Sequence, residues 1–435
     1  MNGANQHVIS RQVVSIEYHG SEYEALQFQR RLDDLLKTSL VPGMEKCFDQ
    51  LASSGQYISI DRLDIELKNI HKSETDYFVS DQIIAGIQSA VKEKLTRQQH
   101  AGEQEAQDYI RSPEEYAAIG LIHFLEHGRL PWNIQLQPGE KLEEYLAARI
   151  HQQPIPANYL KTIGLLISES NGLRRLTQHF TQGFIKSILN QVQHAVQITH
   201  ETDGLKRAQS PQRIGKKNLT TPATVKIPGK KSVRDQQTQA QQGADLASAP
   251  IVKSTSKQKP VHVSTSTPIY IENAGLILLH PFLPQLFRIL ELISENGTAH
   301  PGMALLVLNY CIHGEKTASE YNLVLPKILC SISIDEYVET TQPLPGEAMA
   351  EADNMLTAAI RHWDALRNTS IEALRATFLQ RPGRLTFDET HGWLLVVEVK
   401  TFDVLLNYIP WGLSMIQLPW MDSMLQVQWD YQQLS

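Results

Sequence analysis

The segment from residue 201 to residue 265 places the strongest constraint on how this chain can fold. It is rich in Gln, Ser, Thr, Lys and Pro, has no aromatic residue, and shows no apolar periodicity. Such a composition cannot bury enough apolar surface to offset the entropy lost on ordering. One continuous helix is also prevented by five prolines: Pro211, Pro222, Pro228, Pro250 and Pro260. The sequence therefore predicts a disordered linker.

The linker divides the chain of 435 residues into two regions, each long enough to bury a core of its own. The predicted domains are 1–200, the basic linker 201–265, and 266–435. Between Glu201 and Pro260 there are twelve Lys or Arg and four Asp or Glu, a net charge of +8, so the rest of the chain carries −15. A basic segment can bind nucleic acid. Without interleaved aromatic residues, however, a solvated tether is favoured and no nucleic-acid partner is expected.

Several protein classes are excluded by simple features of the sequence. The first thirty residues lack the apolar core of a signal peptide. The longest apolar run, residues 276–283, is far shorter than the roughly 20 residues of a membrane span. Three cysteines without CxxC spacing argue against a disulfide framework and suit a reducing compartment. We therefore expect synthesis in the cytoplasm and no membrane span.

The N-terminal region shows a strand, helix, strand pattern followed by helices. Strands are predicted at Val8–Tyr18 and Tyr57–Leu67, where apolar residues alternate. Between them, helical spacing runs from Leu26 to Phe48, with a kink at Pro42-Gly43. Further helices are predicted at Asp81–Gln98, Tyr116–His127 and Lys161–Glu169.

The C-terminal region reads as helices followed by a small antiparallel sheet. The helices are a buried one at Ala304–Ile312, an amphipathic one at Met349–Leu366, and one that begins at a capping box of Thr369 and Glu372. A hairpin turns at His391-Gly392, a short helix ends at Pro410, and two short strands follow near Leu413–Leu418 and Leu425–Trp429. The predicted fold class is α+β, with two folded regions joined by the linker.

One short motif could carry metal chemistry. HFLEH places His123 and His127 on one helix face, where they could hold zinc, with Glu126 as the base that activates a bound water. Such a short pattern arises by chance, the following residues GRLPW end the helix, and no credible third ligand is found. We therefore reject the zinc site and predict no catalytic residue, no cofactor and no metal.

Three other side chains stand out in the sequence. His280 lies between an apolar run and Pro281, so the sequence predicts a corner between two helices rather than a catalytic site. Trp411 and Trp420 each stand beside a proline in a short loop-like context. They are the candidates for exposed interface anchors.

The C-terminal phrases YIENAGLILLHPFLPQLF, FLQRPGRL and IPWGLSMIQLPWM, together with ISIDRLDIEL and GRLPW nearer the N-terminus, resemble the tape measure proteins of contractile injection systems. These systems are phage-tail-like particles of bacteria, and the resemblance covers roughly residues 8–150 and 268–430. It implies a non-enzymatic assembly protein that sets the length of the inner tube and lies in its lumen.

The resemblance also implies partners and leaves alternatives open. The expected partners are the inner tube and the baseplate or hub proteins, with self-association as a further possibility. The expected location is the cytoplasm during assembly and then the inside of the tube. One alternative is an adaptor that assists assembly or loads cargo on the same particle. The other is a zinc metallohydrolase that uses His123, Glu126 and His127.

Overall fold

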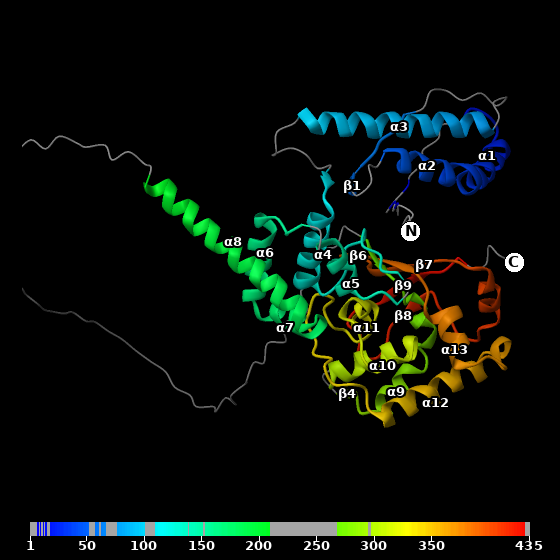
Figure 1. Cartoon of the computed structure of the whole chain (residues 1–435). Helices are drawn as coiled ribbons and strands as arrows, with labels where there is room; N and C mark the ends of the chain where they lie inside the picture. Colours follow the sequence, from blue (N-terminus) through cyan, green and yellow to red (C-terminus); the bar gives the residue numbers. More distant parts are fainter. Residues whose placement is uncertain are drawn as a thin grey trace, which may run out of the picture. The chain divides into compact units, whose positions relative to one another are not determined.

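The computed structural model describes residues 7, 9, 12, 14, 18–51, 57–60, 62–66, 76–100, 109–137, 139–150, 153–208, 268–294 and 297–430. It confirms the α+β class, with many helices and a small sheet (Figure 1). Most of the predicted linker, 209–265, lies outside the described residues. Helix α8 (Gln182–Ala208) continues past residue 201, where the linker was predicted to begin.

The first three helices form a small packed group near the N-terminus. Helix α1 (Glu22–Leu35) passes through a π-helical turn (η1, Leu36–Leu40) into α2 (Val41–Leu51), and α3 (Asp76–His100) packs against α2. Pro42 has no N–H to close an α-helical turn, so the irregularity falls directly before it. In place of the kink predicted at Pro42-Gly43, the structure therefore has a π turn that ends at Leu40.

The strand predicted at Tyr57–Leu67 is much shorter in the structure, and the one predicted at Val8–Tyr18 lies largely outside the described residues. Strand β1 (Tyr57–Ser59) pairs antiparallel with β2 (Tyr109–Arg111). Beyond β1, Ile60, Leu63 and Ile65 pack against the core of α2 and α3. Their alternation therefore reflects contact with the helices and not strand pairing.

Helices α4 to α8 share one core. They are α4 (Pro113–His127), α5 (Leu142–Ile150), α6 (Ala157–Ser168), α7 (Ser170–His179) and α8, and the core contains Leu121, Phe124, Leu146, Ile163 and Leu176. Ser112 and Glu115 form a capping box at the start of α4. The helices predicted at Tyr116–His127 and Lys161–Glu169 are confirmed, as is the one at Asp81–Gln98, which is longer than predicted.

The C-terminal domain is built around helix α10 (Pro301–His313), which is buried along nearly its whole length. The other helical segments are η2 (Ala274–Leu279), α9 (Leu283–Ile289), η3 (Glu320–Asn322), α11 (Val324–Leu329), α12 (Gly346–His362), η4 (Asp364–Leu366), α13 (Ile371–Leu374), η5 (Arg375–Leu379) and η6 (Thr401–Tyr408). Two small strands, β4 (Ile293–Ser294) and β5 (Gly297–Thr298), pair with each other. The predicted buried and amphipathic helices are confirmed.

The sheet of this domain is mixed, and not antiparallel as predicted. Its order is β3 (Ile269–Ile271), β6 (Gly383–Asp388), β7 (Gly392–Val397), β9 (Leu425–Gln428) and β8 (Met415–Ile416). The predicted hairpin is β6 and β7, but β7 and β9 run parallel because η6 and β8 intervene between them. Strand β3 was not predicted, because three residues give too short a pattern.

The structure defines the cap of α13 and the corner at His280. Ser370, and not Thr369, is the residue that caps α13, with its hydroxyl accepting from the N–H of Ala373 at 3.2 Å. His280 lies between η2 and α9, as predicted. Its ring Nδ1 bonds the carbonyl oxygen of Ile277 at 2.9 Å.

Candidate functional site

The HFLEH motif lies in the last turns of α4, where its side chains are occupied by neighbours. His123 Nδ1 donates to the carbonyl oxygen of Arg129 at 2.9 Å. His127 Nδ1 lies 3.3 Å from Asp335 Oδ1, and its Nε2 lies 3.7 Å from Glu126 Oε2. The two imidazole rings lie 4.7 Å apart between centroids, and their planes are tilted by 55°.

The protonation state of His123 is set by its burial. Burial lowers the pKa of His123 to about 4, partly offset by the hydrogen bond to Arg129, so the ring is neutral at physiological pH. In the part of the chain that the structure describes, no group of three or more His, Cys, Asp or Glu side chains is placed to hold a metal ion. The absence of bound zinc stays a prediction, which metal analysis of the purified protein and of a His123→Ala variant would test.

Both candidate tryptophans make contacts within the C-terminal domain. Trp420 stacks on Phe287 with ring centroids 5.0 Å apart, and its Nε1 donates to the carbonyl oxygen of Leu329 at 2.8 Å. Trp411 packs edge-on against Phe282 at 5.2 Å. Each is half-buried. A role for either in contact with a partner stays a prediction.

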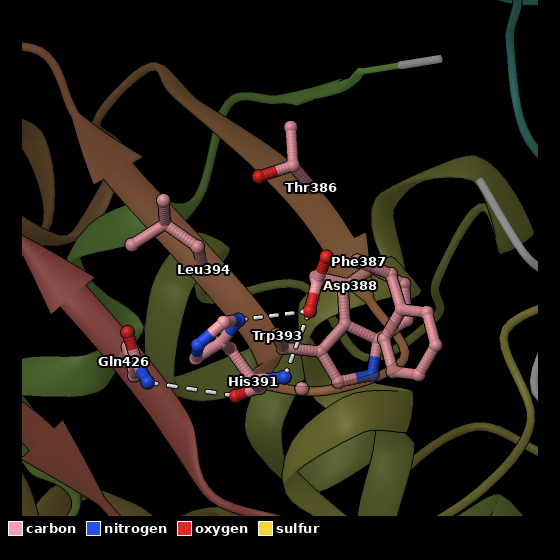
Figure 2. A pocket seen from close by; sticks show the side chains of 8 residues that line it. Thr386, Phe387, Asp388, His391, Trp393, Leu394 and Gln426 are labelled. Carbon is pink, nitrogen blue, oxygen red and sulfur yellow. Dashed lines mark hydrogen bonds and ion pairs between the residues drawn. The ribbon is translucent and has the colours of Figure 1, made fainter. Parts of the chain in front are cut away.

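A shallow hollow of about 340 Å³ lies at the tip of the β6–β7 hairpin. Figure 2 shows Asp388 and His391 turned toward each other there. Asp388 Oδ1 accepts from the backbone N–H and the ring Nδ1 of His391, each at 2.9 Å, and from the N–H of Thr390 at 2.8 Å. The turn's own backbone donors hold the pKa of this carboxyl below its ordinary value. The acidic group thus stabilises the turn and is not set up as a catalytic base.

A nearly fully buried cluster of charged side chains joins helix α7 to the C-terminal domain. Arg175 donates through Nε to Glu320 Oε2 at 3.0 Å and through Nη2 to Glu320 Oε1 at 3.1 Å. Lys327 Nζ donates to Glu320 Oε1 at 3.0 Å. The side chains of all three are only 1–2% exposed. Burial alone would raise the pKa of Glu320, but Lys327 and Arg175 lower it below its ordinary value.

Helices α4 and α7 contact residues 318–340. We call this contact the charged seam. Sequence reasoning missed it because Arg175 and Glu320 are 145 residues apart and neither stands in a recognisable motif. An arginine in an amphipathic helix ordinarily predicts a solvated face. Gly128 ends α4 with a φ of 69° and lies so close to Glu320 that a Cβ would collide with its carboxylate, but in the sequence it indicates only the end of a helix.

Comparison with known proteins gives one match. No curated protein and no solved structure matches the chain. No helix among the described residues has the length and apolarity required to cross a membrane. The family model described as contractile injection system tape measure protein matches residues 6–429. That match includes both folded regions and the segment between them, and the chain therefore belongs to the contractile injection system tape measure protein family.

Proposed function

We propose that this protein is a non-enzymatic assembly component of a contractile injection particle, which sets the length of the inner tube from within the lumen. The observation that carries the proposal is the family match across residues 6–429. The side chains of HFLEH and of the Asp388 turn support a structural role, because each is engaged by its own neighbours.

The proposed partners are the inner tube and the baseplate or hub proteins, with self-association as a further possibility. Large apolar side chains exposed near the C-terminus support such contacts. Among them Phe402 and Tyr408 on η6 and Met415 on β8 are 63–66% exposed. The protein would be made in the cytoplasm and then enclosed in the tube.

An adaptor for assembly or cargo loading is the second candidate, and the charged seam favours it. The segment 209–267 has 59 residues, and as a tether it would extend to about 195 Å at ~3.3 Å per residue. With both of its ends held on one body, it would double back and extend to only about 100 Å. A short extent suits an adaptor better than a long ruler.

The two candidates differ in where the protein is found after assembly. Intact particles would be purified, treated with protease to remove exposed protein, and analysed by mass spectrometry. We expect peptides from both folded regions to survive, because the tube wall shields the lumen. A fully assembled, active particle that lacks the chain would reject the luminal ruler and favour the adaptor.

A further inference from the structure

The folded regions before and after segment 209–267 contact each other directly in the structure. Described residues before residue 197 and after residue 268 belong to one compact unit. Arg175 lies at the centre of their contact. Besides Glu320, it donates to the carbonyl oxygens of Leu125 at 3.0 Å and Glu126 at 2.6 Å, both on α4, and to that of Asp335 at 2.7 Å.

The Glu320 carboxylate, on the C-terminal side of this contact, also has its hydrogen-bond donors. Glu320 accepts from Arg175 and from Lys327, and Lys327 Nζ also donates to the carbonyl oxygens of Ile334 at 3.2 Å and Glu336 at 2.7 Å. Buried charges are tolerated only where each is paired and hydrogen-bonded in this way. The geometry therefore requires that both regions are in place at once.

Further contacts surround this centre. Arg129 Nε donates to Asp335 Oδ1 at 3.2 Å, and Gln178 donates to Thr340 Oγ1 at 2.8 Å. The phenol of Tyr337 donates to the amide oxygen of Gln178. A buried centre inside a polar margin is the arrangement of specific protein interfaces.

An aromatic contact extends the charged seam into the helical core. Phe124 of α4 meets Tyr321 edge-on at 6.4 Å between ring centroids, and Tyr321 packs against the core formed by α4 to α8. A side chain of the C-terminal domain thus completes the core of the N-terminal helices. The two sets of elements are therefore not independent in the described structure.

We infer that the helical region 112–197 and the domain 268–430 bind each other through the charged seam without help from the covalent connection. Segment 209–267 is then a loop tied at both ends, and not a tether between two free bodies. The partner of the surface on α4 and α7 is the chain's own C-terminal domain. This inference goes beyond the proposed function, because it holds whether the protein measures the tube or only assists its assembly.

The test uses the full chain with a site for a sequence-specific protease inserted near Ala240. After complete cleavage, the products are analysed by size exclusion at about 1 μM, a concentration at which the fragments stay together only if their Kd lies below about 1 μM. We expect them to elute together at the volume of the uncleaved chain. Elution as two separate folded fragments would overturn the inference, and this measurement needs no change in the seam.

A variant then assigns the association to the charged seam. Arg175→Met removes the central guanidinium and is expected to weaken fragment association by at least about 100-fold. The matched control is Arg367→Ala, which removes an exposed ion pair with Asp364 and should leave association unchanged. Unchanged association in folded Arg175→Met would reject the seam as the binding surface.

Discussion

Loss of Arg175 should destabilise the folded chain strongly, because its guanidinium is buried and fully paired. Arg175→Met leaves Glu320 with Lys327 alone, and it leaves the carbonyl oxygens of Leu125, Glu126 and Asp335 without this donor. Removing one partner of a buried pair costs about 3–5 kcal/mol. We expect the free energy of unfolding, measured by urea denaturation, to fall by about 3 kcal/mol. Arg367→Ala should change it by less than about 0.5 kcal/mol, and equal effects of the two variants would contradict the burial argument.

Two buried histidines make the protein sensitive to acid. Burial lowers the pKa of both His123 and His179 to about 4, whereas an unfolded histidine titrates at 6.5. Between these values the unfolded chain binds more protons than the folded one, so stability falls as the pH is lowered from 6.5 toward 4. Urea denaturation at about pH 7 and about pH 5 would measure the loss.

The contribution of one histidine can be isolated. His179 Nε2 is buried and has no hydrogen-bond partner within the described residues, so His179→Leu should be tolerated. We expect this variant to lose less stability between the two pH values than the unaltered protein. The same pH dependence in both proteins would show that His179 does not titrate as its burial requires.

Among the elements, long periodic helices were predictable and short strands were not. Helix α12 was predicted from its apolar stripe, and α10 from a run of residues that is apolar nearly all round. Strand β3 has three residues, and its pairing with β6 depends on residues more than a hundred positions away. The parallel pairing of β7 with β9 also depends on tertiary packing. The spacing of residues within a short stretch of sequence predicts neither of these pairings. The charged seam was not predicted for the same reason.

The end of α4 offers a prediction about a single turn. Gly128 has a φ of 69° and faces the Glu320 carboxylate, so Gly128→Ala adds backbone strain and a collision with that side chain. Gly139 has a φ of 83° with open space around its Cβ position, and Gly139→Ala therefore adds strain alone. We expect thermal unfolding to show a clearly larger loss for Gly128→Ala, by at least about 1 kcal/mol. Equal losses would mean that the side chain of Glu320 moves freely.

At the scale of the whole molecule, the charged seam shortens the distance that the linker can span. A chain tied at both ends extends half as far per added residue as a chain between two separate anchors. Insertions in the linker should be thermodynamically mild, because loop-closure entropy grows slowly with length. Tube length can therefore be tested without unfolding the protein.

The most direct test of length control is a series of Gly/Ser insertions of about 30 and about 60 residues near Ala240, because Gly/Ser-rich sequences behave as flexible chains. Tube lengths of assembled particles would be measured by electron microscopy. We expect uniformly longer tubes, with an increase of up to about 1.7 Å per inserted residue, half the extended value of ~3.3 Å, because both ends of the loop are held. Normal particles of unchanged length would contradict the proposal that this protein sets the length of the tube.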